Sequence, residues 1–162
     1  YAAIKELYLA LHGKLKSAGV DLIAQWFAGG KNKHLESFLA HPESSILVWT
    51  DSFWQWVDIP GDDLQYLVIH KLPFSPPSDP IFMARSALFA DGFHDYAIPK
   101  TGIKLRQWLG RLIRSHSDTG MILFLDERVL TTKWWKYFLD IFPEGITIFQ
   151  SGSDKLLTLL KK

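Results

Sequence analysis

The sequence predicts an α/β domain with a mostly parallel sheet covered by helices on both faces. Short apolar runs that suit strands alternate with longer segments whose apolar residues recur every three or four positions. The runs are nearly continuous in apolar residues, as expected of parallel strands buried on both faces. The chain has 162 residues, 48% of them hydrophobic, and no internal repeat or linker, so we expect one domain over residues 1–162.

The first half of the chain should open with a helix and continue with short strands. Residues 3–18 carry an apolar stripe at helical spacing, made by Ile4, Leu7, Leu11 and Leu15, and Gly19 ends it. The elements expected next are a strand at 20–24, a helix at 33–40, a strand at 45–50 and a strand at 64–70.

The second half should be mainly helical, with a buried strand inside it. A proline-rich loop at 73–80 is too stiff for a regular element, and Asp79 should cap a helix that has Pro80 in its first turn and runs to about residue 90. The elements expected after it are a helix at 98–115, a strand at 120–125, a helix at 131–142, a short strand at 146–149 and a helix at 155–161.

The bulk composition excludes several classes of chemistry. The chain has no cysteine, which removes disulfides, thiolate catalysis and cysteine-ligated zinc or iron–sulfur clusters, and fits a reducing compartment. The net charge of +1 means that any nucleic-acid surface must be a local patch. No apolar run is long enough to cross a bilayer, so we expect no membrane association. Because the chain starts on Tyr1 rather than Met, we expect a piece of a longer protein.

The helix predicted at 98–115 is the most informative segment. Gln107, Arg111 and Arg114 are spaced by four and three residues, so they should share one face, where Gly110 allows close backbone approach. Arginine forks bind phosphate oxygens through paired hydrogen bonds, which suits a phosphate group. A solvated basic face is an equal alternative from this helix alone. The opposite, buried face should hold Leu105, Leu109, Leu112 and Ile113.

Residues 50–61 follow a predicted strand and are dense in polar, aromatic and turn residues. Ligands of parallel sheets bind at the carboxyl ends of strands, where this segment and the loop at 71–79 should lie. Ser52 and backbone N–H groups suit phosphates, Phe53 or Trp54 suits a base, and Asp58 suits a ribose or an arginine. A turn with an aromatic plug is an equally favoured alternative.

Other motifs resemble chemical sites but lack their required partners. Gly29-Gly30-Lys31 lacks both the earlier glycine and the following Ser or Thr of a phosphate-binding loop. Asp126 ends a strand as a magnesium-binding carboxylate would, but it more simply caps the next turn or pairs with Arg128. The six histidines have no metal-ligand spacing, and no Gly-x-Ser-x-Gly elbow occurs. We therefore expect no metal site in this chain.

Arginines without a phosphate-binding loop suit a protein that holds ATP between two domains. Four segments then resemble, in order, the second RecA-like domain of the DinG/XPD group of superfamily-2 DNA helicases, and most closely its bacterial DinG-like branch. Residues 50–61 resemble motif V, and 107–114, Gln-Trp-Leu-Gly-Arg-Leu-Ile-Arg, resemble motif VI. The stretch 71–80 with its following Ala84-Arg85, and the strand at 120–128 with its Leu-Asp-x-Arg ending, complete the match.

The resemblance implies a RecA-like three-layer α/β/α fold and a role as half of an ATP-driven DNA helicase. Gln107, Arg111 and Arg114 would face the ATP phosphates as catalytic residues, with Asp58 and Gly61 also near the nucleotide. The residues toward single-stranded DNA would be Thr50, Ser52, Phe53 and Trp54. ATP with Mg²⁺ would be completed by the first RecA-like domain of the same polypeptide, in the cytoplasm. The iron–sulfur cluster of many relatives belongs to that first domain, not to this chain.

The sequence departs from the family pattern in motif V. The usual Glu-Gly is Gln55-Trp56, and a glycine common before the threonine is Trp49. These changes keep open a degenerate, non-catalytic interaction module, and a weaker third idea is a stand-alone nucleotide-binding protein. The strand that relatives place before the first helix is also absent, which predicts an open edge or exposed apolar surface. Alone, the chain should not hydrolyse ATP.

Overall fold

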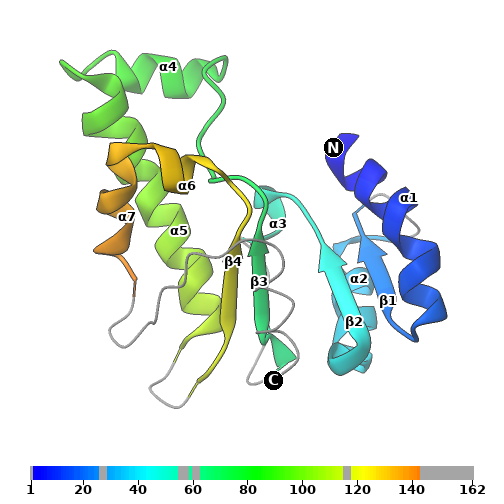
Figure 1. Cartoon of the computed structure of the whole chain (residues 1–162). Coiled ribbons are helices and arrows are strands. Elements are labelled where there is room, and N and C mark those ends of the chain that lie inside the picture. The colour runs from blue at the N-terminus through cyan, green and yellow to red at the C-terminus, as the bar shows by residue number, and fades with distance from the viewer. Residues whose placement is uncertain (1, 26–28, 55–58, 60–62, 115–117, 143–162) are drawn as a thin grey trace.

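The computed structural model describes residues 2–25, 29–54, 59, 63–114 and 118–142 (Figure 1). The strand expected at 146–149 and the helix expected at 155–161 lie outside these residues. Within them, helices alternate with short parallel strands, so the α/β class is confirmed.

The strands form two parallel pairs in the part of the chain that the structure describes. β1 (Asp21–Ala24) pairs with β2 (Ser45–Val48), with Leu22 opposite Ile46. β3 (Tyr66–Ile69) pairs with β4 (Met121–Phe124), with Leu67 opposite Ile122. Among these residues the strands thus form two sheets of two strands each, and every pairing is parallel, as expected.

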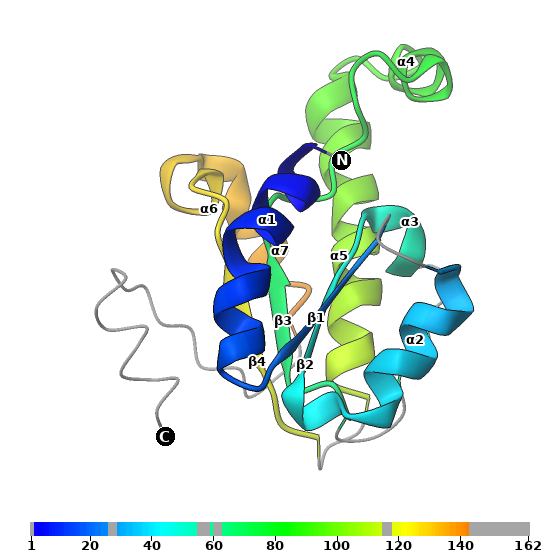
Figure 2. The same cartoon turned by 90° about the vertical axis from the view of Figure 1, so that its right-hand side faces the viewer.

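Helices lie on both sides of the strands, as a three-layer domain requires. Figure 2 shows α1 (Ala2–Ser17) on one side and α2 (Lys31–Ala40) and α5 (Ile98–Leu112) on the other. The covering is incomplete at β3, where Leu67 and Ile69 are buried but Tyr66 and Val68 are 54% and 55% exposed. Burial on both faces, as predicted from the continuous apolar runs, is therefore wrong for this strand.

The first helix buries less of its apolar stripe than its spacing predicts. Ile4 is buried, but Leu7 and Leu11 are 36% and 38% exposed. α1 packs mainly on β1, which pairs on one side with β2. α1 therefore leaves part of its apolar stripe at the surface.

The helix after the proline-rich loop begins where the sequence predicts and ends earlier. α4 spans Pro80–Ser86, and the Asp79 carboxylate accepts hydrogen bonds from the N–H groups of Ile81 and Phe82 at 2.9 and 3.1 Å. This capping is confirmed. A π-helical turn at Gly92–Ala97 follows, started by Asp91 in the same way. The prediction of one helix to about residue 90 is wrong: α4 ends at Ser86, residues 87–91 form turns and a bend, and Asp91 then starts the separate π-helical turn.

The long helix α5 keeps its predicted buried face but ends three residues early. Leu105, Leu109 and Leu112 are 0%, 1% and 3% exposed. Ile113 then turns to an extended conformation, with φ −118° and ψ 100°, and the Asp118 carboxylate accepts the Arg114 N–H at 2.7 Å. The helix therefore stops at Leu112, and Arg114 lies beyond it.

The helix predicted at 131–142 is broken into short pieces. The structure has α6 (Arg128–Thr131), a 3₁₀ turn at Lys133–Trp135 and α7 (Lys136–Leu139). Thr132 is extended, and its hydroxyl donates to the Arg128 carbonyl at 2.6 Å. A β-branched residue whose hydroxyl bonds to the local backbone competes with helix formation, which explains the break.

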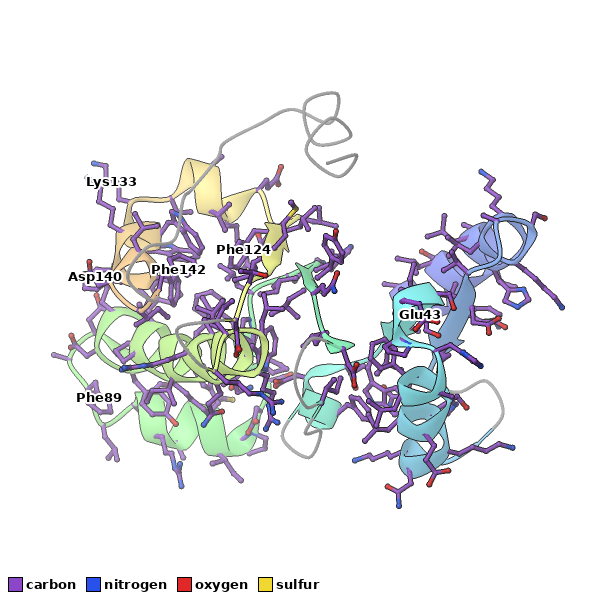
Figure 3. All side chains as sticks on the ribbon, turned by 90° about the horizontal axis from the view of Figure 1, so that it is seen from below. Glu43, Phe89, Phe124, Lys133, Asp140 and Phe142 are labelled. Atoms are coloured by element: carbon purple, nitrogen blue, oxygen red, sulfur yellow. The ribbon has the colours of Figure 1, made fainter. Side chains whose placement is uncertain are left out.

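Buried side chains gather in two clusters, one for each pair of strands (Figure 3). The α5 cluster joins β3, α5 and α7 through residues such as Leu67, Leu105 and Phe138. The α2 cluster contains Phe38, Phe53 and Ile59. Leu64 packs against both. Leu64 therefore connects the two clusters.

Candidate nucleotide and nucleic-acid site

The segments predicted to meet ligands follow the carboxyl ends of strands. β2 ends at Val48 and leads through Thr50 into α3 (Asp51–Trp54). β3 ends at Ile69 and leads into the loop at 71–79. Both segments leave the same end of the strands (Figure 1), which is where parallel sheets bind ligands.

Thr50 is fixed to the end of the neighbouring strand. Its hydroxyl donates to the side-chain carbonyl of Gln25 at 2.8 Å, and its backbone N–H donates to the same oxygen at 3.3 Å. Gln25 directly follows β1. The start of the motif V-like segment is therefore held by two hydrogen bonds rather than left as a free turn.

The ring of Phe53 lies in the α2 cluster and not on the surface. Phe53 is 2% exposed and stacks on Trp49, with ring centroids 3.9 Å apart and planes inclined by 27°. Trp49 is one of the departures from the family pattern, and its ring holds Phe53 inward. The aromatic-plug alternative is therefore what Phe53 does here, and its ring is not offered to a base.

Several predicted site residues cannot be placed. Asp58 and Gly61 lie outside the described residues, as do Gln55 and Trp56. Ser52 and Trp54 belong to α3 by their backbone, and their side chains are likewise outside what the structure describes.

Gln107 and Arg111 lie one turn apart on α5, as predicted. Gln107 is exposed and Arg111 is half-buried. Gly110, beside them, is exposed, and a Cβ added there would meet no atom within 4 Å. Packing inside the described residues therefore does not require this glycine, so its close approach would have to be to something outside them.

Arg114 does not share the helix face with Gln107 and Arg111. Because it lies past the end of α5, its guanidinium turns back, with one NH₂ group donating to the Ile59 carbonyl and Nε to the Arg111 carbonyl at 3.4 Å. The predicted stacking of three side chains is wrong for this residue. The structure instead brings Arg114 to the segment that resembles motif V.

An ion pair that the sequence reasoning missed also joins α5 to this segment. Lys104 Nζ lies 2.6 Å from Asp51 Oδ2. Lys104 is spaced three residues before Gln107, so helical spacing places it on the polar face. That spacing was the available signal, but the partner lies 53 positions away in the sequence.

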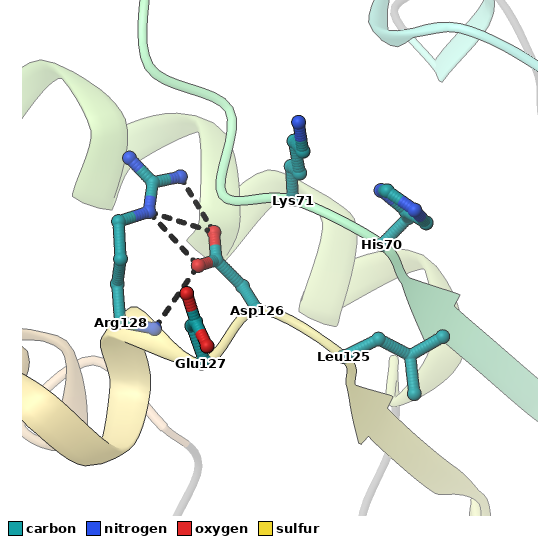
Figure 4. Close-up of a pocket in the computed structure, with 6 residues that line it drawn as sticks. All are labelled: His70, Lys71, Leu125, Asp126, Glu127 and Arg128. Carbon is teal, nitrogen blue, oxygen red and sulfur yellow. Dashed lines mark hydrogen bonds and ion pairs between the residues drawn. The ribbon is translucent and has the colours of Figure 1, made fainter. Parts of the chain in front are cut away.

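A pocket of about 440 Å³ lies at the carboxyl ends of β3 and β4 (Figure 4). Asp126 is one of the residues that line it, and its carboxylate accepts hydrogen bonds from Arg128 Nε at 2.8 Å and from the Leu72 N–H at 2.8 Å. These bonds, chiefly those from Arg128, lower the pKa of Asp126 from 3.8 to about 2. The predicted pairing is confirmed. The pocket is lined by His70, Lys71, Leu125, Asp126, Glu127 and Arg128.

The described residues include neither a group of metal ligands nor a membrane-spanning helix. No group of three or more His, Asp or Glu side chains lies close enough there to hold a metal ion. No helix among these residues is both long and apolar enough to cross a bilayer.

Comparison with known proteins identifies the family. The family model described as the helicase C-terminal domain matches residues 1–145. This chain belongs to the helicase C-terminal domain family. Its α/β architecture with parallel strands is consistent with the RecA-like fold of such domains.

The relatives of this helicase C-terminal domain are proteins of the DinG and YoaA type. It is 33% identical over 144 residues to the 3′-5′ exonuclease DinG of Bacillus subtilis. The aligned region covers 86% of this chain and 16% of that protein. It is 39% identical over 119 residues to the ATP-dependent DNA helicase YoaA of Haemophilus influenzae, covering 71% of this chain and 18% of that protein. It is also similar to the ATP-dependent DNA helicase DinG of Photobacterium profundum, with 37% identity over 103 residues, 61% of this chain and 15% of that protein. The chain thus spans less than one fifth of the length of these relatives.

Proposed function

We propose that this domain is the second motor domain of an ATP-dependent DNA helicase of the DinG type. Its α5 would supply Gln107 and Arg111, and the segment after α5 would supply Arg114, to an ATP site between two RecA-like domains. The observation that carries this proposal is the contact of α5 and of the residues after it with the segment that follows β2. Lys104 of α5 contacts Asp51, and Arg114, beyond the end of the helix, contacts Ile59. Segments that resemble a nucleotide motif and a nucleic-acid motif are thereby in direct contact.

The proposed chemistry divides between the two domains. Arginine side chains facing the phosphates would stabilise the charge that develops on the transferring phosphoryl group. Asp58 and Gly61 would lie near the nucleotide. Mg²⁺ and the phosphate-binding loop would be supplied by the first RecA-like domain of the same polypeptide. The names of the Haemophilus influenzae YoaA and Photobacterium profundum DinG relatives, which call them ATP-dependent DNA helicases, support the use of ATP.

The proposed DNA surface is the start of the segment that follows β2. Thr50, Ser52 and Trp54 would face single-stranded DNA in the cytoplasm, and Phe53 would hold the turn in shape from the core, because its ring is buried. The fixing of Thr50 to Gln25 supports a preformed surface rather than a loop that orders on binding.

The deciding experiment is Arg111→Ala in the full-length protein. Loss of such an arginine costs about 10³-fold or more in the rate of ATP hydrolysis. Arg106→Ala is the matched control, because Arg106 is an exposed arginine on the same helix away from the proposed face. If DNA-stimulated hydrolysis is unchanged in Arg111→Ala, the proposed function is wrong.

A second candidate is favoured by one feature of the sequence. Gln55-Trp56 replaces the family's usual Glu-Gly, which removes a charge and adds a large ring. The domain would then be a non-catalytic nucleic-acid or protein interaction module with a helicase fold. Restoring Glu-Gly in the full-length protein separates the two: a large gain of hydrolysis supports degeneration, and no change supports an active variant motif.

A further inference from the structure

Asp51 and Lys104 form an ion pair across the boundary between the two core clusters. Asp51 opens α3, whose Phe53 belongs to the α2 cluster, and Lys104 stands on α5, which belongs to the other cluster. The charged atoms are 2.6 Å apart, and the two side chains are 23% exposed for Lys104 and 38% for Asp51. The pair is therefore partly shielded from water, which strengthens the attraction between the two charged groups.

Both ends of this contact are attached to fixed structure. On one side Thr50, next to Asp51, is bonded to Gln25, and Phe53 is buried two residues later. On the other side Lys104 stands on a helix whose opposite face is anchored by Leu105 and Leu109. If α3 is displaced, the ion pair must therefore either separate or carry α5 along with α3.

Lys104 also stands on the same side of α5 as the proposed catalytic residues. It precedes Gln107 by three positions and Arg111 by seven, which is one and two helical turns. A shift or rotation of α5 that follows Asp51 would consequently move Gln107 and Arg111.

We propose that the Asp51–Lys104 ion pair is a positioning contact that makes ATP hydrolysis respond to DNA. This inference rests on the proposed function. DNA bound to Thr50, Ser52 and Trp54 displaces α3, and the ion pair then carries the polar face of α5 into the orientation that hydrolysis requires. Neither residue touches the nucleotide, so the pair acts through Gln107 and Arg111.

The test uses the full-length protein with Asp51→Asn, Lys104→Met and the exchanged pair Asp51→Lys with Lys104→Asp. The rate of hydrolysis is measured without DNA and with saturating single-stranded DNA, together with KM for ATP and the Kd for the DNA. We expect each single variant to lower the DNA-stimulated kcat about tenfold, with the rate without DNA, KM and the Kd changed less than about twofold. The exchanged pair should recover most of the stimulation. A double variant that combines Asp51→Asn with Lys104→Met should be no worse than either single variant.

Arg106→Met is the matched control for Lys104→Met, because both remove a basic side chain from α5 but Arg106 lies away from Asp51. It should keep full stimulation. The inference is wrong if DNA stimulates hydrolysis normally in Lys104→Met and Asp51→Asn. It is wrong too if the losses of stimulation in the two single variants simply add in the double variant. It is also wrong if the rates with and without DNA fall together, because that indicates a role in the fold. The proposed function fails separately, through unchanged hydrolysis in Arg111→Ala.

Discussion

At the scale of single residues, some side chains of the motif-like segments make contacts inside the domain. Phe53 and Arg114 both belong to segments that resemble helicase motifs, and the structure gives each a contact inside the domain. The Phe53 ring stacks on Trp49, and Arg114 bonds to the Ile59 carbonyl. Residue type and motif position alone do not separate a ligand contact from such an internal contact.

Replacing Phe53 tests whether its ring serves the core or the DNA. We expect Phe53→Leu to keep single-stranded DNA binding within about twofold, because a buried ring contributes packing and no base stacking. Its free energy of unfolding should fall by about 1–1.5 kcal/mol, against about 3–5 kcal/mol for Phe53→Ala. DNA binding is read by fluorescence anisotropy and stability by denaturant unfolding. A tenfold weaker Kd in a stable Phe53→Leu protein would show that the ring does reach DNA.

Asp126 gives a prediction for the pH dependence of stability. Arg128 lowers the pKa of the Asp126 carboxyl to about 2, so its ionised form stabilises the folded state above the ordinary pKa of 3.8. That stabilisation is lost as the pH falls from about 4 to about 2. We expect Asp126→Asn to lower the free energy of unfolding at pH 7 by about 1–2 kcal/mol, discounted because Arg128 is partly exposed.

The measurement for Asp126 is urea unfolding of the chain and its variant at pH 7 and at pH 2–4. The difference between the two proteins should shrink toward the acid end. Asp95→Asn is a suitable control, because Asp95 is an exposed carboxylate. A difference that stays constant with pH would mean that the loss comes from packing and not from the charge.

At the scale of elements, the sequence predicts the starts and apolar faces of helices better than their ends. Capping at Asp79 and the leucines of α5 follow from local pattern and are confirmed. The end of α5 depends on Asp118, and the break after α6 on a threonine hydroxyl. Contacts that shape the candidate site join residues 53 and 55 positions apart, so no local pattern contains them.

Replacing Gly110 should affect the stability of α5 and its proposed role in ATP hydrolysis in opposite directions. A Cβ there meets nothing within 4 Å, so Gly110→Ala should fit the domain and raise the free energy of unfolding by about 0.5–1 kcal/mol through helix propensity. If α5 closes on ATP and the first domain, the same methyl group obstructs that approach, and DNA-stimulated hydrolysis in the full-length protein should fall about tenfold or more. A stabilised variant with full hydrolysis would mean that nothing approaches α5 at this glycine.

At the scale of the whole molecule, the described residues form two packed halves, and Leu64 packs against both. Each half has its own pair of parallel strands and its own buried cluster. The sequence predicts the strands and the helices that build these halves, but not their separation into two clusters. That separation places the segment resembling motif V at the junction, where Asp51 and Ile59 meet residues of the other half.

The isolated chain should lack ATPase activity. The 162-residue chain carries the arginines that we propose face phosphate but no phosphate-binding loop sequence, because Gly29-Gly30-Lys31 lacks its required neighbours. Charge stabilisation without a bound, oriented nucleotide gives little acceleration. We therefore expect no ATP hydrolysis above background from this chain with Mg²⁺ and single-stranded DNA, measured by phosphate release, while the full-length protein is active under the same conditions. Hydrolysis by the chain alone that Arg111→Ala abolishes would mean that a complete site exists within these residues, and that the division of the site between two domains is wrong.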